Sequence, residues 1–346
     1  MSIRLVLTFV AAVALAAGPV WREATPGYRY QFPRDHFEHQ DFRTEWWYYT
    51  GNVVDAHGKR FGFELVFFRQ GEFPANPNPS VWAVKDLYLA HAALTDIDGK
   101  RFWYQERPNR QGPGIAGASF EKRRVWNGNW QAQWNGDDQA LDAIADDFRY
   151  HLDLKPLKPP VINGVSGLSV KADGPGHASY YVSFPRLGVT GNIRVGKDDH
   201  AVTGQAWMDH EWFTEQLSSD QQGWDWFSVQ FDNNTELMLF ELRRKDGTID
   251  AHSSGTFIDA SGRAHHLKHE DVKLTPLRKV GKYPVEWRIE IPSLKVNVTC
   301  RAAVDNQELR SQSGGPNYWE GAVKYDGTNR GVGYLEMTGY EGAVHF

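Results

Sequence analysis

WWYYTGNVVDAHGKRFGFELVFFRQG, residues 46–71, and WDWFSVQFDNNTELMLFELRRKDG, residues 224–247, are two versions of one pattern. Each runs from an aromatic strand through a turn that contains Asp into a second strand, and each ends in Gly. Aromatic and β-branched runs of this length, bounded by such turns, are typical of β-hairpins. Because self-similarity indicates a duplicated unit, the sequence predicts an all-β fold of two tandem antiparallel β-barrel domains.

Short strands dominate the rest of the chain as well. Asp-Gly and Asn-Gly pairs, which favour tight turns, separate strand-like runs at 61–68, 85–94, 178–184, 223–231, 237–243 and 285–291. The best candidate for a helix is the short stretch Asp138–Phe148. We expect a first domain over residues 18–215 and a second over 216–346, with the proline-rich stretch 154–164 as a loop inside the first.

The composition excludes some partners and points to a pocket. The 346 residues carry a net charge of -5 with a pI near 6.2, which gives no electrostatic reason to expect nucleic acid or an anionic membrane as a partner. The 14 Trp, 14 Tyr and 19 Phe indicate an aromatic-lined pocket, bulky barrel cores, or both. The chain lacks a P-loop, a dinucleotide fingerprint, a G-x-S-x-G elbow and an H-E-x-x-H helix, so those classes of enzyme have no support.

The segment GQAWMDHEW, residues 204–212, carries the main candidates for chemistry. Alternation along a strand sends Trp207, Asp209 and Glu211 to one face and Met208, His210 and Trp212 to the other. Either face therefore places a titratable group beside an aromatic ring, as in a ligand-binding or catalytic cavity. The alternative is an outward-facing polar row above ordinary Trp packing.

Several segments together resemble the AttH/CrtC-like, lipocalin-like family. They are EWWYYTGN (45–52), ASYYVSFPRL (178–187), AWMDHEW (206–212), GWDWFSVQFDNNTELMLFELRRKDG (223–247) and YWEG (318–321). That family includes carotenoid 1,2-hydratase, kievitone hydratase, fungal lipocalin-like cyclases and exported bacterial proteins called secreted hydrolases. The resemblance implies two packed lipocalin-like barrels, an apolar cavity between or within them, and no metal or organic cofactor.

Hydration of an alkene sets clear chemical requirements. Protonating an unactivated double bond needs a carboxyl group that burial keeps neutral, and the resulting cation needs aromatic faces. A base or an imidazole must then guide water. The family's hydratases associate a His-x-Trp and a Tyr-x-Asp element with this work, and His210-Glu211-Trp212 matches the first.

The second element is missing from this chain. After Trp212 the sequence offers only Tyr318-Trp319-Glu320 and Tyr334-Leu335-Glu336, so Asp209, Glu241 or Glu336 are the substitute acids. This departure puts carotenoid hydration itself in doubt.

The candidate site follows from these residues. We expect His210 and Trp212 to face an aromatic cavity shared with residues 45–49, while Asp209 or Glu241 supplies the acid. Because Asp209 and His210 are adjacent, both can serve one cavity only through a bulge or by support from behind. The catalytic candidates are Asp209, His210 and Glu241, and the substrate-binding candidates are Glu45, Trp46, Trp47, Tyr49, Trp207, Trp212, Trp226 and Phe240.

Structural interpretations compete with these assignments. Glu45 and Glu241 have arginines nearby in sequence-predicted hairpins, Arg69 and Arg243, and could form ion pairs with them. Trp46 and Trp226 could be barrel-plug tryptophans.

His91 and His252 occupy corresponding places in the two repeats, which favours a shared structural hydrogen bond. The histidine clusters at 36–39 and 265–269 resemble metal sites only in composition, and we expect no metal.

Three classes of function remain open. The first is an exported, cofactor-independent hydratase or cyclase/isomerase for a lipophilic, polyene or terpenoid-like substrate. The second is a non-catalytic periplasmic binder or carrier of a lipophilic ligand, associated with an ABC-type exporter. The third is a glycan-binding module, which a flat exposed row of aromatic rings would favour over an enclosed one.

The N-terminus reads as a secretory signal over residues 1–17. Arg4 precedes an apolar run from Leu5 to Ala17 that is too short to span a bilayer. The single cysteine, Cys300, excludes an internal disulfide. We therefore expect a periplasmic or secreted protein without a transmembrane anchor after cleavage.

Cleavage of this signal is directly testable. Because Ala14 and Ala16 form an A-x-A-like site, N-terminal sequencing of the protein from its native host should begin near Ala17 or Gly18. An intact N-terminus, or retention in the inner-membrane fraction, would contradict the prediction.

Overall fold

The computed structural model describes residues 20–75, 78–313, 315 and 317–344, which are nearly all β. The signal segment predicted at 1–17 lies outside them. The first half contains β1 (Thr44–Asp55), β2 (Arg60–Gly71), β3 (Asp86–Asp96), β4 (Arg101–Arg110), β5 (Ala116–Ser119), β6 (Arg124–Asn127), β7 (Trp130–Asn135), β8 (Asp138–Ile144), β9 (Phe148–Pro156), β10 (Val161–Ile162), β11 (Ser169–Val170), β12 (Ala178–Val195) and β13 (Asp198–Phe213).

The second half continues with β14 (Gln221–Phe231), β15 (Glu236–Arg244), β16 (Ser254–Ile258), β17 (Ala264–Lys268), β18 (Lys273–Val280), β19 (Tyr283–Ile291), β20 (Val296–Ala302), β21 (Glu308–Leu309), β22 (Tyr318–Gly327) and β23 (Gly331–Met337). Short 3-10 turns occupy Arg34–His36, His269–Asp271 and Pro292–Leu294. None of the helices in the described ranges is long and apolar enough to cross a membrane.

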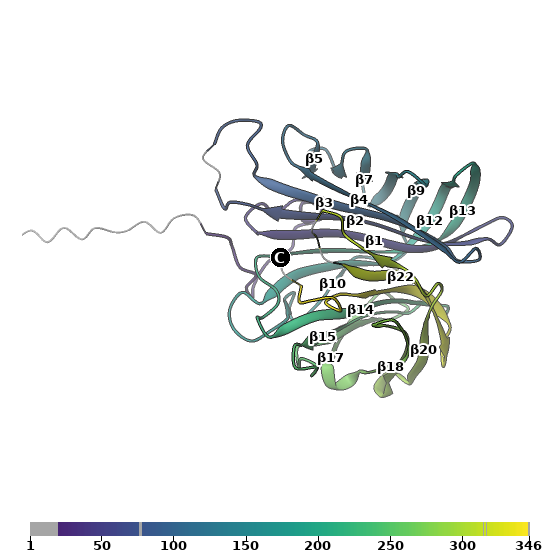
Figure 1. Ribbon diagram of the computed structural model, residues 1–346. Helices are drawn as coiled ribbons and strands as arrows, with labels where there is room; N and C mark the ends of the chain where they lie inside the picture. Colours follow the sequence, from purple (N-terminus) through teal and green to yellow (C-terminus); the bar gives the residue numbers. More distant parts are fainter. Residues whose placement is uncertain (1–19, 76–77, 314, 316, 345–346) are drawn as a thin grey trace, which may run out of the picture.

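Two curled antiparallel sheets hold these strands (Figure 1). The first has the order β4-β3-β2-β1-β13-β12-β9-β8-β7-β6-β5, and the second has the order β17-β16-β15-β14-β23-β22-β20-β19-β18. In each sheet the opening hairpin, β1–β2 or β14–β15, pairs through its first strand with the final strand of the sheet. This shared order confirms the all-β fold and the duplication inferred from 46–71 and 224–247. One sheet closes nearly into a barrel, whereas the other forms a half-barrel.

The prediction of a helix at Asp138–Phe148 is wrong. Asp138–Ile144 forms strand β8, and Phe148 begins β9. Burial along β8 alternates, with Gln139, Leu141 and Ala143 inside, so the segment has the period of a strand. Pairing with β7 and β9 outweighs the helix propensity of its alanines and leucine.

The two sheets pack against each other through their outer faces. The apolar part of this interface is a separate cluster, distinct from the core of either sheet, and includes Tyr181, Trp207, Trp226, Phe240 and Tyr334. The chain passes from the first sheet to the second between Phe213 and Gln221. The proline-rich stretch 154–164 stays with the first sheet, since it links β9 to β10.

A buried ion cluster fastens this interface at one end. Glu236 of β15 is fully buried and accepts hydrogen bonds from two cations of the first domain. Lys158 Nζ lies 2.7 Å from one carboxylate oxygen, and Arg186 Nε lies 2.5 Å from the other. Removing the anion would leave two buried cations without their partner, which is costly.

Glu236→Gln should therefore lower the free energy of unfolding by about 3 kcal/mol, as measured by urea denaturation. The matched control is Glu290→Gln, because Glu290 pairs with Lys273 at 3.6 Å where both side chains are solvent-accessible. That exposed pair should contribute less than about 1 kcal/mol. Equal losses in the two variants would show that the buried cluster does not fasten the interface.

Candidate functional site

The two faces of β13 point into different environments. Its register with β1 pairs Tyr48 with Asp209 and Trp47 with His210. Tyr48 and Asp209 face the second domain, whereas Trp47 belongs to the core of the first sheet. The register shift in this region lies in β12, between Phe184 and Leu187. The strand β13 therefore separates its acidic and imidazole groups.

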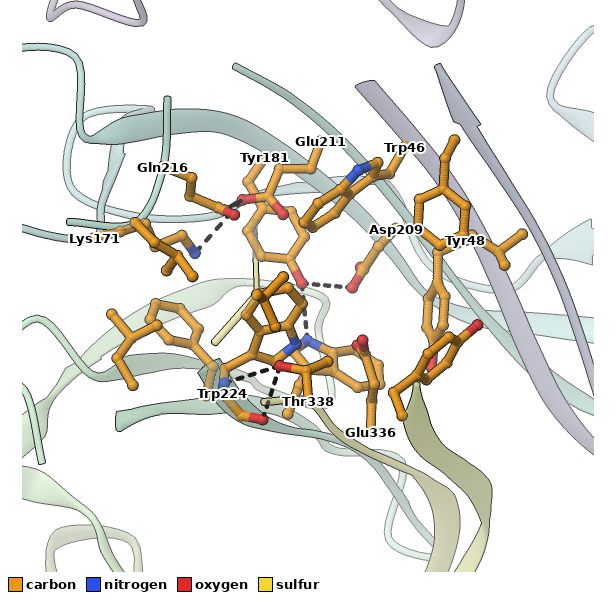
Figure 2. A pocket seen from close by; sticks show the side chains of 18 of the residues that line it. Trp46, Tyr48, Lys171, Tyr181, Asp209, Glu211, Gln216, Trp224, Glu336 and Thr338 are labelled. Atoms are coloured by element: carbon orange, nitrogen blue, oxygen red, sulfur yellow. Dashed lines mark hydrogen bonds and ion pairs between the residues drawn. The ribbon is translucent and has the colours of Figure 1, made fainter. Parts of the chain in front are cut away.

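The acidic face of β13 lines a pocket between the two domains (Figure 2). Its aromatic lining comes from both sheets and comprises Trp46, Phe68, Tyr181, Trp224, Trp226, Phe240 and Tyr318, along with Tyr48. The cavity has a volume of about 80 Å³, which is several times the space that one water molecule needs. The pocket therefore has room for water molecules and for apolar groups of a ligand.

Asp209 is held at the pocket wall by three donors. Tyr181 donates its hydroxyl to one carboxylate oxygen at 2.5 Å, while Ser183 and the Trp207 indole donate to the other at 2.5 and 2.6 Å. Burial raises the pKa of Asp209 to about 7, although these hydrogen bonds favour the anion. Asp209 is therefore poised between its two protonation states near neutral pH.

Glu336 and Glu320 reach the same pocket from the second sheet. They are cross-strand partners in β23 and β22, so both carboxyl groups lie on one face. Burial raises the pKa of Glu336 to about 8, and the charges of Glu211 and Asp209 add to this effect. Burial and the charges of Glu64 and Glu336 also raise the pKa of Glu320, whose carboxyl accepts a hydrogen bond from Tyr48. A pKa of about 8 keeps Glu336 mostly protonated at pH 7, and burial likewise favours the protonated form of Glu320.

These two residues are the ends of the Tyr-x-Glu elements found in the sequence. Strand alternation places Tyr318 and Glu320 on one face of β22, and Tyr334 and Glu336 on the corresponding face of β23. In β14 and β23, Trp226 pairs with Glu336, just as Tyr48 pairs with Asp209 in the first sheet. The duplication thus places two equivalent carboxyl groups, Asp209 and Glu336, in the shared pocket.

A charged pair forms another part of the lining. Lys171 Nζ lies 3.5 Å from a Glu211 carboxylate oxygen and 3.7 Å from the centre of the Phe240 ring. Burial lowers the pKa of Lys171, although Glu211 opposes this shift. Glu211 also accepts hydrogen bonds from Ser179 and Gln216. This pair can meet a polar group on an otherwise apolar ligand.

The opposite face of β13 belongs to a separate buried network. Glu45 is fully buried, and one of its oxygens lies 2.7 Å from His39 Nδ1 and 2.9 Å from His210 Nε2. Arg69 Nε approaches the other oxygen at 3.2 Å. The His39 ring stacks on Trp212 with 4.0 Å between ring centres. The ion pair expected between Glu45 and Arg69 is confirmed.

This network has the composition of a metal site. Among the described residues, His39, Glu45 and His210 form the group whose ligand atoms lie close enough to hold an ion. Both imidazole nitrogens already lie at hydrogen-bond distance from one carboxylate oxygen, and Arg69 places a positive charge on the other. The arrangement fits an ion-paired network better than a cation site.

The structure divides the residues named from the sequence into three groups. Asp209, Trp46, Trp226 and Phe240 line the pocket, and Trp207, on the same face of β13 as Asp209, donates a hydrogen bond to it. Trp47 and Tyr49 lie in the core of the first sheet, and Glu45, His210 and Trp212 form the buried network. The expectation that His210 and Trp212 face the cavity is therefore wrong, because β13 is regular there and presents only one face to it.

Glu241 lies outside the residues that line the pocket. It belongs to a smaller hollow beside Ser253 and His269, and burial raises its pKa to about 7. Arg243, its expected partner, pairs instead with Asp225 at 2.9 Å. The structure does not bring Glu241 together with Asp209.

The expected range 45–49 already included Tyr48, but sequence reasoning passed over the lining residues Lys171, Tyr181 and Tyr318. For Tyr318 the signal was present, because it alternates with Glu320. Tyr181 shares a face with Ser183, and only the structure shows that Ser183 pairs with Asp209. Lys171 follows the short strand β11, and no local pattern indicates it.

Comparison with known proteins identifies relatives of this architecture. A family model described as AttH-like matches residues 23–340. The crystal structure of an AttH candidate from Nitrosomonas europaea is 35% identical, with a TM-score of 0.83 over 92% of this chain and 99% of that one. A search of curated proteins finds no match.

Two further solved structures share the fold at low identity. Kievitone hydratase from Nectria haematococca is 15% identical, with a TM-score of 0.67 over 87% of this chain and 91% of that one. CghA is 13% identical, with a TM-score of 0.54 over 86% of this chain and 88% of that one.

The buried network predicts a specific pH dependence of stability. Burial alone would raise the pKa of Glu45, but His39, His210 and Arg69 lower it below its ordinary value. A carboxyl group with a lowered pKa contributes stability above its unfolded pKa of about 4.3, and the contribution disappears as the pH falls. Glu45→Gln should thus cost about 3 kcal/mol at pH 7 in urea denaturation, and less below about pH 4.

The control for Glu45→Gln is Asp142→Asn. Asp142 forms a similar contact with His151 at 2.7 Å, but at the surface, where the histidine is half exposed. Its loss should change stability by less than about 1 kcal/mol at either pH. A pH-independent effect of Glu45→Gln would contradict the ion-paired network.

Proposed function

Because the chain belongs to the AttH-like family, we propose that it is an exported, cofactor-independent hydratase or cyclase/isomerase acting on a lipophilic, polyene or terpenoid-like substrate. One observation carries this proposal. Carboxyl groups whose pKa burial raises to about 7 or 8 line an aromatic pocket between two domains. Such groups can donate a proton at neutral pH, which an ordinary carboxylate cannot.

Glu336 is the general acid in this proposal. Its carboxyl faces the pocket, and its pKa of about 8 keeps it protonated at pH 7. Asp209 has the lower pKa of the two and three hydrogen-bond donors that favour its anion. Two carboxyl groups whose environments separate their pKa values suit the roles of acid and base.

The aromatic side chains suit a cationic intermediate. The rings of Trp46 and Trp224 lie 5.8 Å apart, and those of Tyr48 and Trp226 meet edge to face at 5.2 Å. All four line the pocket. Ring faces stabilise a cation that water does not solvate, so they can offset the cost of charge in an apolar space.

The proton balance distinguishes the possible outcomes. Transfer of the Glu336 proton to an alkene carbon uses the π electron pair and leaves a cation at the other carbon. In hydration, water attacks this carbon and Asp209 takes the proton that the water loses. In cyclisation or isomerisation, a second double bond attacks, or a neighbouring C–H gives its proton to Asp209.

A carrier of a lipophilic ligand is the second candidate. The aromatic lining supports it equally well, because apolar contact alone binds such ligands. In this case the protein would pass its ligand to a partner such as an ABC-type exporter, and the carboxyl groups would only shape the pocket. Export and the absence of an anchor after signal cleavage are common to both proposals.

Substitution of the acids separates an enzyme from a carrier. Glu336→Gln and Asp209→Asn should each slow conversion by roughly a hundredfold or more, while binding of cis-parinaric acid, a fluorescent polyene, changes little because the apolar contacts remain. Glu241→Gln should slow conversion far less, since Glu241 does not line the pocket. Conversion is followed by mass spectrometry of terpenoid polyenes, as gain of one water or as formation of an isomer.

The unmodified protein provides the decisive reference. If it binds cis-parinaric acid but converts no polyene that co-purifies with it from the native host, the carrier is correct and the enzyme is not. Full activity in Glu336→Gln would instead remove Glu336 from the role of acid.

A further inference from the structure

A continuous chain of polar side chains leads away from the pocket wall toward the surface. Tyr318 lines the pocket, and its hydroxyl lies 3.1 Å from Glu64 Oε1 and 2.5 Å from His91 Nδ1. Glu64 and His91 lie on β2 and β3 of the first sheet, while Tyr318 lies on β22 of the second. The chain therefore crosses the domain interface beside the pocket.

The outer end of this chain is Glu106 on β4. His91 Nε2 lies 3.7 Å from a Glu106 carboxylate oxygen, inside ion-pair distance but beyond a hydrogen bond. Glu106 is partly exposed and accepts hydrogen bonds from Ser311 Oγ and from the backbone N–H groups of Gln312 and Ser313, at 2.9, 2.6 and 2.6 Å. The buried Nε2 atom of His91 has no hydrogen-bond partner among the described residues.

The charges along this chain have the order that proton transfer requires. The contact with His91 lowers the pKa of Glu106 to about 2, and the donors of residues 311–313 act in the same direction. Burial lowers the pKa of His91 and raises that of Glu64 to about 8. At neutral pH an anion thus lies at the surface end, a neutral imidazole in the middle and a protonated carboxyl group at the inner end.

We propose that His91 and Tyr318 relay protons from solvent at Glu106 to the buried carboxyl groups beside the pocket. The inference rests on the proposed function, because each turnover moves a proton from Glu336 to Asp209, and proton exchange with solvent returns both groups to their starting states. Glu64 is the receiving group, and Tyr318 and Glu320 form the adjoining pocket wall. Water in the pocket can carry the proton from there to Glu336.

The relay conserves protons and leaves no charge on its middle members. With Glu64 ionised, the Tyr318 hydroxyl donates to Glu64, His91 Nδ1–H donates to the Tyr318 oxygen, and Nε2 is bare. A proton from the Glu106 side binds Nε2, the Nδ1 proton moves to Tyr318, and the tyrosine proton moves to Glu64. His91 ends in its other neutral tautomer, with Nε2–H directed at Glu106.

Other titratable groups near the relay do not interrupt it. The Tyr150 hydroxyl donates to the backbone oxygen of Glu64 at 2.7 Å and leaves its carboxyl group free. The charge of Glu336 raises the pKa of Glu64, which favours the protonated form. Phe68 meets the His91 ring edge to face at 5.5 Å and holds it in place without competing for a proton.

His91 is distinct from His252, with which the sequence repeat aligned it. His252 precedes β16 and binds Asp250 at 2.8 Å in a turn, whereas His91 lies within β3. The two residues do not share a structural hydrogen bond, so the expectation of equivalent roles is wrong. A role of His91 in holding the domains together through Tyr318 is the competing explanation.

Proton exchange at Glu64 distinguishes a relay from a structural contact. The carbonyl stretch of protonated Glu64 is identified in infrared spectra of the ligand-free protein by its loss in Glu64→Gln. After rapid mixing with D₂O, this band shifts as its proton exchanges. His91→Gln, which keeps a polar group but cannot transfer a proton at neutral pH, should slow the shift by at least about tenfold. Glu106→Gln should slow it as well.

His200→Gln is the matched control. His200 also pairs with a carboxylate, Asp55, at 2.8 Å, and its Nε2 is likewise buried without a partner among the described residues. This variant should exchange Glu64 at the rate of the unmodified protein. Unchanged exchange in both folded His91→Gln and Glu106→Gln would overturn the relay.

Measurements of stability and activity distinguish a failure of the relay from a failure of the proposed function. Thermal unfolding identifies a His91→Gln variant that fails to fold, and Glu106→Gln, near the surface, then decides the question alone. Slowed exchange in a protein that converts no polyene would support the relay and overturn the enzyme. Conversion with unslowed exchange would do the reverse.

Discussion

Burial of carboxyl groups between two apolar sheet faces is the constraint on which the pocket depends. A carboxylate taken out of water loses its hydration, and it recovers stability only through donors, cations or a proton. Asp209 has donors, Glu236 has two cations, and Glu336 and Glu320 retain protons. The packing of the sheets therefore selects which acids are structural and which can give up a proton.

The positions of the cations separate the structural acids from the acids that can give up a proton. Lys158 and Arg186 meet Glu236 at one end of the interface, and Arg69 meets Glu45 on the far side of β13. In the pocket itself Lys171 pairs with Glu211, and no cation forms an ion pair with Glu336 or Asp209 among the described residues. An acid beside a cation would stay ionised, so this separation preserves the neutral carboxyl groups.

Duplication explains why the pocket lies between the domains and draws on both. Each sheet presents an aromatic residue opposite an acid at the same place in its strand order, Tyr48 with Asp209 and Trp226 with Glu336. Their environments then differ. Asp209 receives three hydrogen bonds, which favour its anion. Glu336 instead lies beside Glu320, and the charge of Asp209 helps to raise the pKa of Glu336. Two similar repeats thereby supply two carboxyl groups of unequal acidity.

The sequence by itself determined the all-β fold, the duplicated hairpins and the two faces of residues 207–212, because these follow from the period of two along a strand and from turn residues. It failed at Asp138–Phe148, where strand pairing outweighed helix propensity. Only the tertiary structure decided which face of β13 meets the pocket, since both faces carry an acid or imidazole beside an aromatic ring. It also brought His91, Glu64 and Tyr318 together across more than two hundred residues, because packing of one sheet on another depends on contacts that no local pattern encodes.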